Sequence, residues 1–273
     1  MIIKTLAENT SLTEDFGNEH GLSLYIETKG HKILFDVGAS NLFLQNAQKL
    51  GVNISDVDFL VISHGHYDHG GGLEAFFQEN HKAKVYIHQK AFERHAVLFA
   101  DGKIVDIGLK EELKENKRLV FIGDNYIIDQ SMFLFSNANQ KYPQPSTNKG
   151  LVLERQGQII EDSSEHEQNL VIEEDGKILL LTGCAHNGII NIVEQFHIIR
   201  GRMPDYVIGG FHLSTSIAGD EAPETIDKIG KYLLDTGAKY YTCHCIGLAP
   251  YERLKKLMGD KVEYLSTSRI ITI

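Results

Sequence analysis

The chain has 273 residues, of which 42% are hydrophobic and 23% are charged, and its formal net charge is −10 at pH 7. This composition is typical of a soluble globular protein with a sizeable core, and the acidic balance argues against a nucleic-acid binder, which usually presents a basic face. No apolar run approaches the about 20 residues that cross a membrane, and no signal peptide is visible. The three cysteines form no disulfide framework, so we predict a cytoplasmic protein.

The N-terminal part predicts strands that alternate with helices. Two strand-like runs flank a Lys29-Gly30 turn, and Ser40 begins a helical segment that closes at Gly51. The apolar stretch FLVIS indicates a short buried strand. In chain order we predict strands within residues 22–38, a helix at 40–51, a strand at 59–63, a helix at 71–80, a strand at 84–88 and a helix at 89–99.

The segment from about residue 101 to residue 167 has a weaker pattern. It contains strand-like LVFIGD, polar SNANQKYPQPSTNKG and acidic EDSSEHEQ. We predict a loop-rich insertion that shapes a substrate pocket, within a single domain that spans residues 1–273. The alternative is that the segment is only a connector.

Alternation returns after residue 168. Asp175-Gly176 is typical of a hairpin turn, and strands that alternate with helices indicate an α/β layered fold. In order we predict a hairpin at 169–186, a helix at 187–201, a strand at 205–213, a helix at 220–237, a strand at 239–245, a helix at 249–259 and strand segments within 262–273.

Four predicted strands end in ligand-type side chains, in the segments SHGHYDH, GCAH, GGFH and CHC. Open α/β sheets place ligand sites at the carboxyl ends of their strands, so these histidines are expected to meet. His64 and His66 are two residues apart and point the same way in an extended segment, so they can bind one ion. Asp68 and His69, offset by a bend, suit a second ion. The cluster offers more ligands than a closed structural zinc site needs.

The segment HGHYDH resembles the His-x-His-x-Asp-His motif of the metallo-β-lactamase superfamily. ILFDVG is similar to an earlier motif of that superfamily, with Asp36 in the position that supports the metal loop. The resemblance implies a four-layer αββα sandwich of the metallo-β-lactamase type. Six segments, EHGLSLYIE, GHYDHGGGL, EQNLVI, TGCAHNGIINIV, GGFHL and CHCIG, are similar to the branch related to 7,8-dihydropterin-6-methyl-4-(β-D-ribofuranosyl)aminobenzene-5′-phosphate synthase.

The resemblance also implies the metal ligands. The first ion would take His64, His66 and His186, and the second ion would take Asp68, His69 and His244. Many hydrolases of the superfamily have a bridging aspartate where this chain has Cys184. Cys184 is therefore either a softer ligand or a sign that the bridge is absent, and His212 is either a further ligand or a contact to a substrate phosphate.

Other candidates carry less signal. His20 is expected to touch substrate on the branch resemblance, and Lys149 is a candidate phosphate contact. His95, like His31, His81 and His197, is interpreted as a surface or core residue, and His166 as lying outside the site. Cys243 and Cys245 would face away from His244 if that stretch is extended.

We predict a dinuclear metal-dependent hydrolase that acts on a phosphate ester or phosphodiester through a metal-bound hydroxide, with Asp68 as the catalytic residue. Zinc is the expected metal, with manganese or iron as alternatives. The branch resemblance implies a second chemistry, in which an aromatic amine attacks a pterin methylene and diphosphate leaves. A third possibility is a non-catalytic metal or ligand sensor. We expect a small phosphorylated substrate and no nucleic-acid or membrane partner, and the oligomeric state has no signature.

Overall fold

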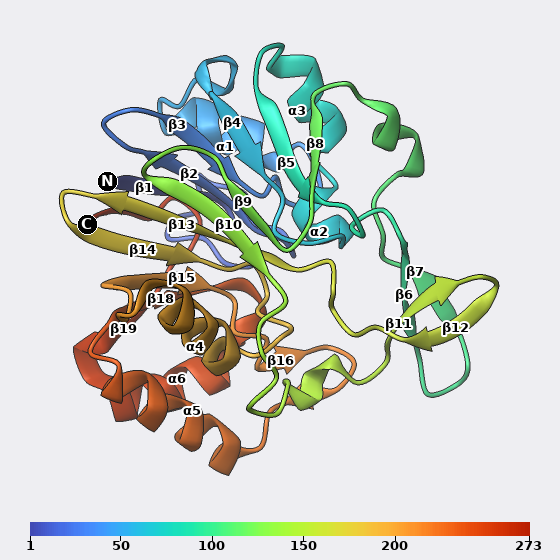
Figure 1. Ribbon diagram of the computed structural model, residues 1–273, viewed down its shortest axis with the longest axis vertical. Coiled ribbons are helices and arrows are strands. Elements are labelled where there is room, and N and C mark those ends of the chain that lie inside the picture. Colours follow the sequence, from blue (N-terminus) through green and yellow to red (C-terminus); the bar gives the residue numbers. More distant parts are fainter. The chain divides into compact units, whose positions relative to one another are not determined.

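The computed structural model describes residues 1–273, which divide into two compact units. Unit 1 comprises Met1–Asp124, Leu151–Gln168 and Leu265–Ile273. Unit 2 comprises Asn125–Gly150 and Asn169–Tyr264. Each unit has its own seven-stranded sheet (Figure 1). None of the helices is both long and apolar enough to cross a membrane. The single domain with a pocket-shaping insertion stays a prediction.

The large sheet of unit 1 has the strand order β20-β1-β2-β3-β4-β5-β8. Strands β3, β4, β5 and β8 are mutually parallel, so their carboxyl ends lie at one edge of the sheet. The strand predictions at 22–38, 59–63 and 84–88 are confirmed. The bounds are β1 Ile2–Ala7, β2 Ser23–Glu27, β3 Lys32–Phe35, β4 Phe59–Val61, β5 Lys84–His88, β8 Leu119–Ile122 and β20 Ile270–Thr272.

Three helices of unit 1 are α1 (Leu42–Lys49), α2 (Tyr67–Gly70) and α3 (Leu73–Glu79), and the predicted helices at 40–51 and 71–80 are confirmed. Phe43 of α1 and Phe76 of α3 are fully buried in one core cluster with sheet residues. Burying such a side chain contributes about 1.5–3 kcal/mol to folding, which fixes these helices against the strands.

A smaller sheet of unit 1 corrects one prediction. Residues 89–99 do not form the predicted helix but include a strand, β6. Its pairing with β11, remote in sequence, overrides the local helical pattern. The predicted loop-rich segment is thus partly strand, and Figure 1 shows this sheet as an arm apart from the large sheet of unit 1. Its order is β12-β11-β6-β7, with bounds β6 Arg94–Leu98, β7 Ile104–Asp106, β11 Leu151–Arg155 and β12 Gln158–Glu161.

The sheet of unit 2 has the strand order β19-β18-β15-β14-β13-β10-β9. The predicted hairpin is confirmed, and its turn residues Asp175 and Gly176 both have positive φ, at 52° and 73°, as a tight hairpin turn requires. Strands β14, β15, β18 and β19 are parallel. The bounds are β9 Asn125–Ile127, β10 Met132–Ser136, β13 Gln168–Glu174, β14 Lys177–Leu181, β15 Tyr206–Gly209, β18 Lys239–Thr242 and β19 Val262–Tyr264.

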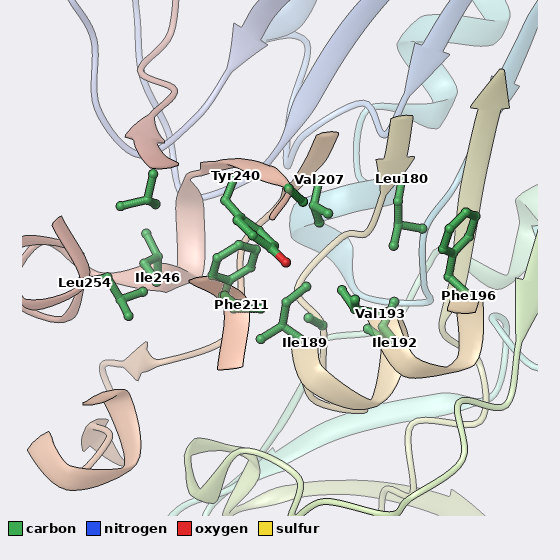
Figure 2. Packing of buried hydrophobic residues seen from close by; sticks show 14 of the residues in the cluster. Leu180, Ile189, Ile192, Val193, Phe196, Val207, Phe211, Tyr240, Ile246 and Leu254 are labelled. Atoms are coloured by element: carbon green, nitrogen blue, oxygen red, sulfur yellow. The ribbon is translucent and has the colours of Figure 1, made fainter. Parts of the chain in front are cut away.

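The three long helices of unit 2 are α4 (Ile189–Arg200), α5 (Pro223–Asp235) and α6 (Leu248–Met258), all as predicted. Figure 2 shows α4 placing an apolar stripe, including Ile192 and Phe196, beside sheet residues of the same core.

The remaining elements of the two units are β16 Ser214–Thr215, β17 Gly219–Asp220 and the 3₁₀ helices η1 Ile54–Asp56, η2 Glu111–Glu115, η3 Ser146–Asn148, η4 His244–Ile246 and η5 Gly259–Lys261. The mixed α/β class is therefore confirmed.

Candidate metal centre

The predicted ligand loop of unit 1 directly follows β4. His66 is extended, with φ −92° and ψ 147°, and the short helix α2 then turns Asp68 and His69 back toward the strand end. The His64 ring lies 4.6 Å from the His66 ring and 4.1 Å from the His69 ring, measured between centroids. All four side chains are buried. Unit 1 thus brings together His64, His66, Asp68 and His69.

Asp36, just beyond the end of β3, holds this loop in place through hydrogen bonds. Its Oδ1 accepts the Ser63 backbone N–H at 2.7 Å, and its Oδ2 accepts the Ser63 hydroxyl at 2.7 Å and the His69 Nδ1–H at 2.7 Å. The carboxylate is fully buried. A buried carboxylate with three donors holds the strand end and the ligand loop in one arrangement.

These bonds assign the tautomers of two imidazoles. His69 donates from Nδ1 to Asp36, so its lone pair is on Nε2. The single proton of the Ser63 hydroxyl goes to Asp36, so this oxygen accepts from His64 Nδ1, 2.9 Å away. Both histidines therefore carry the Nε2 lone pair that a metal ion needs, with Nδ1 held by a fixed acceptor.

The protonation preferences of the neighbouring rings differ. Burial, reinforced by the nearby His166 and His95, holds the pKa of His66 well below its ordinary value, so His66 is neutral, which is the metal-binding form. Burial also lowers the pKa of His69, but the carboxylates of Asp68 and Asp36 outweigh it and raise the pKa overall. Asp68 and Asp36 thus supply negative charge where a cation would be held.

The structure places His20 on the solvent side of Asp68. Its Nε2 lies 3.2 Å from Asp68 Oδ2, and 59% of its side chain is exposed. Its Nδ1 is 3.4 Å from the amide nitrogen of Asn9. An accessible imidazole on a buried carboxylate is well placed to meet a substrate.

Unit 2 presents two of the predicted histidines side by side, with the His186 and His212 ring centroids 4.2 Å apart. The Asn148 amide donates to His186 O at 2.8 Å, so its oxygen accepts from His186 Nδ1 at 3.0 Å. The Thr147 hydroxyl donates to His212 O and accepts from His212 Nδ1 at 2.9 Å. Consecutive residues of η3 therefore reserve Nε2 of both histidines for a ligand.

The other predicted residues of unit 2 are Cys184, His244 and Lys149. Cys184 and His244 are buried, and Lys149 is exposed just after η3. The stretch around Cys245 is not extended, because β18 ends at Thr242 and η4 follows, so the condition under which Cys245 would face away from His244 is not met. The Cys245 thiol turns back toward Cys184 O, 3.6 Å away.

Five of the ten non-glycine residues with positive φ are candidate ligands, are adjacent to one in sequence, or, as Asp36, bind one. Asp36, Ala185, Phe211, His212 and His244 all have φ between 47° and 67°, in the left-handed region that favours glycine. Each costs on the order of 1–3 kcal/mol and persists only where surrounding contacts over-determine it.

Sequence reasoning missed a buried group in unit 1 formed by His95, Asp162 and His166. Asp162 Oδ2 lies 2.7 Å from His95 Nδ1 and 3.4 Å from His166 Nε2. Burial raises the pKa of Asp162, but the hydrogen bonds from His166 and His95 outweigh it and hold the pKa well below its usual range. The Asp162-x-x-x-His166 spacing before an apolar strand was the available signal, but it was hidden in an acidic run.

His88, at the end of β5, is buried beside this group, and burial, with His166 and Lys90, lowers its pKa from 6.5 to about 4. The folded protein resists protonation that the unfolded chain accepts, so stability is lost as the pH falls from about 6.5 to about 4. We expect His88→Gln to reduce this acid destabilisation by about 2–3 kcal/mol, measured by urea denaturation at pH 7 and pH 4.5. Exposed His81→Gln is the control, and equal losses in wild type and H88Q would contradict the prediction.

Comparison with known proteins gives one family. The sequence profile of the metallo-beta-lactamase superfamily matches residues 17–196. The uncharacterized protein MJ0448 of Methanocaldococcus jannaschii is 29% identical over 261 residues, covering 94% of each chain. From the same organism, 7,8-dihydropterin-6-methyl-4-(beta-D-ribofuranosyl)-aminobenzene-5′-phosphate synthase is 29% identical, covering 98% of this chain and 95% of the synthase.

A solved structure agrees with the profile. The crystal structure of Tm1679, described as a metal-dependent hydrolase of the beta-lactamase superfamily, is 30% identical with a TM-score of 0.84. The match covers 100% of this chain and 99% of that chain. The predicted fold class, that of the metallo-β-lactamase type, is thereby confirmed.

Proposed function

Because this chain belongs to the metallo-β-lactamase superfamily, we propose that it is a dinuclear metal-dependent hydrolase of a phosphate ester or phosphodiester. The observation that carries the proposal is the shared state of four imidazoles. His64, His69, His186 and His212 each have Nδ1 bound to a fixed acceptor, which leaves Nε2 for a metal ion.

The proposed ligand sets follow the superfamily resemblance. His212 has its lone pair on Nε2, which favours a role as a ligand over donation to a phosphate. Cys184 is the softer donor that stands in place of a bridging carboxylate. The proposed ligands are His64, His66 and His186 for the first ion and Asp68, His69 and His244 for the second, with Cys184 and His212 as additional donors.

Two divalent ions supply Lewis acidity and activate water near neutral pH; zinc fits this donor set, and manganese or iron are alternatives. Asp68 would hold one ion and orient the attacking water. His20, exposed against Asp68, can hold a proton at Nε2 near the reacting group. Lys149, exposed after η3, is the proposed contact for the substrate phosphate.

The test is turnover of bis(p-nitrophenyl) phosphate by protein loaded with Zn, Mn or Fe, with the bound metal measured by mass spectrometry. The proposal expects metal-dependent turnover that a chelator removes and added metal restores. Turnover at background with every metal, in protein that does bind metal, would refute the phosphodiesterase.

His64→Ala is expected to lower the metal content to about one ion or fewer per chain, because it leaves only two of the three protein ligands proposed for the first ion, fewer than zinc sites normally use. Metal analysis after extensive dialysis measures the effect. Exposed His81→Ala should keep the wild-type content. A wild-type metal content in H64A would exclude His64 as a ligand.

The relative named as a synthase favours a second candidate, a transferase that joins a dihydropterin-6-methyl group to an aminobenzene ribofuranosyl phosphate. The two candidates separate in one assay with dihydropterin-methyl diphosphate. A transferase releases diphosphate only when the aryl amine is present and forms the joined product. A hydrolase turns over its phosphate ester without any amine.

A further inference from the structure

A second group of ligand-type side chains lies beside the ligand loop, residues 64–69, within unit 1. The ligand-type atoms of His66, His95, Asp162 and His166 all lie within 4.8 Å of one another, and all four residues are buried. The rings of His95 and His166 are tilted, with 3.9 Å between their centroids, and the His166 ring lies 5.1 Å from that of His66. Three histidines and one aspartate in one buried group are also the residue types that a third metal site would use.

The direction of the hydrogen bonds indicates another role. The Gly65 backbone N–H donates to His166 Nδ1 at 2.8 Å, so Nδ1 is the acceptor and the proton of the neutral ring is on Nε2. That Nε2–H faces Asp162 Oδ2, 3.4 Å away. This tautomer is opposite to that of His64 and His69, which keep the proton on Nδ1.

Counting lone pairs argues against a metal ion at this group. The one lone pair of His166 accepts the Gly65 amide. Both nitrogens of His95 face oxygen acceptors, with Nδ1 2.7 Å from Asp162 Oδ2 and Nε2 3.3 Å from Lys90 O. A neutral His95 that donates from Nδ1 to Asp162 keeps one lone pair, on Nε2, which faces the Lys90 carbonyl oxygen. With His66 proposed for the first ion, the group offers a further ion at most this lone pair and the Asp162 carboxylate, which is too few donors for a tight site.

Gly65, whose backbone N–H donates to His166 Nδ1, lies between His64 and His66 in the chain. A Cβ at this position would lie 2.3 Å from the carbonyl oxygen of Ala91. The backbone is therefore confined by Ala91 on one side and bound by His166 on the other. A small shift of this peptide would move both neighbouring imidazoles together.

The contact also ties the loop to the smaller sheet. His95 belongs to β6, and Asp162 directly follows β12. A second hydrogen bond joins the ligand loop to the small sheet, because Tyr67 N donates at 2.8 Å to the carbonyl oxygen of Ile107, the residue just after β7. Two residues that follow strands of the small sheet, Ile107 after β7 and His166 after β12, thus bind the ligand loop at two backbone positions.

We propose that His166, Asp162 and His95 are positioning residues that together hold the Gly65 peptide in place. By fixing this peptide, they set the spacing of His64 and His66 for metal binding. The Asp162 carboxylate, 3.4 Å from His166 Nε2, favours the tautomer with its proton on Nε2, and His166 Nδ1 then accepts the Gly65 amide. Ser164 N–H and His95 fix the carboxylate in turn. The inference rests on the proposed role of His64 and His66 as ligands.

The first test uses two variants of His166. His166→Phe keeps the ring volume and removes the acceptor, and His166→Asn places an amide oxygen near the position of Nδ1. We expect H166F to weaken zinc binding about 10–100-fold, measured by competition with a chromophoric chelator, and H166N to recover most of the affinity. Wild-type affinity in H166F, or equal losses in both variants with native circular dichroism, would overturn the proposal.

The second test needs no variant. Long-range ¹H–¹⁵N NMR of the full-length metal-free protein should give His166 a pyridine-like Nδ1 and a pyrrole-like Nε2, the reverse of His64 and His69. A protonated Nδ1 on His166 would overturn the proposal, as would a third zinc ion per chain that Asp162→Asn removes. Neither test depends on turnover, so a protein that binds zinc as expected but hydrolyses nothing refutes the proposed hydrolase alone.

Discussion

Replacing Asp36 with alanine is expected to lower the free energy of unfolding of the metal-free protein by about 3–5 kcal/mol, because it removes one member of a buried charge-assisted pair. The Ser63 N–H, the Ser63 hydroxyl and His69 Nδ1–H would all lose their acceptor in the interior. Each unsatisfied buried donor costs about 1–3 kcal/mol, and relaxation and water entry recover part of the sum. Urea denaturation with a chelator present measures the effect.

Two variants sharpen this experiment. Asp36→Asn keeps the shape but replaces an acceptor with a donor, so it should remain well below wild type in stability. Asp15→Ala, at an exposed aspartate, should change stability by less than about 0.5 kcal/mol. If D36A unfolded at the urea concentration of D15A, the three bonds to Asp36 would not hold the loop.

Asp68→Ala is expected to lower phosphodiester turnover at least about 1,000-fold, or about 4 kcal/mol of transition-state stabilisation. The variant removes a carboxylate that is proposed both to bind a metal ion and to orient the attacking water. Asp68 Oδ2 lies 3.2 Å from His20 Nε2, so the variant also removes the contact that holds this exposed ring. Turnover is measured with bis(p-nitrophenyl) phosphate at saturating metal.

The matched measurements separate catalysis from metal loss. Metal content is determined for D68A under the assay conditions, and Asp68→Asn tests whether a neutral oxygen donor suffices. We expect D68N to bind more metal than D68A while remaining impaired in turnover. Wild-type turnover in D68A would remove Asp68 from the mechanism, whatever its metal content.

Local sequence patterns were enough to predict most regular elements, for example the hairpin at Asp175-Gly176 and the helix that ends at Gly201. Both elements are determined by residues that are close in sequence, namely a glycine in the left-handed region and a regular pattern of apolar residues. The histidine loop was visible for the same reason, because its ligand-type residues are contiguous.

Features that depend on distant pairing could not be predicted. Residues 94–98 read as helix because their strand identity comes from β11, far along the chain. Thr147 and Asn148 lie in a polar loop with no period, and only folding brings them to His212 and His186. His166 seemed an isolated loop histidine because its partners Gly65 and His95 are brought to it only by tertiary contacts.

The left-handed residues near the proposed ligands have a consequence for the protein in its host. Five such positions, each costing on the order of 1–3 kcal/mol, represent a strain comparable to the whole margin of about 5–15 kcal/mol that keeps a domain folded. Metal ions that bind only the folded chain would restore that margin by mass action. Metal starvation would then shorten the lifetime of the protein as well as silence its chemistry, so its abundance would follow the supply of its metal.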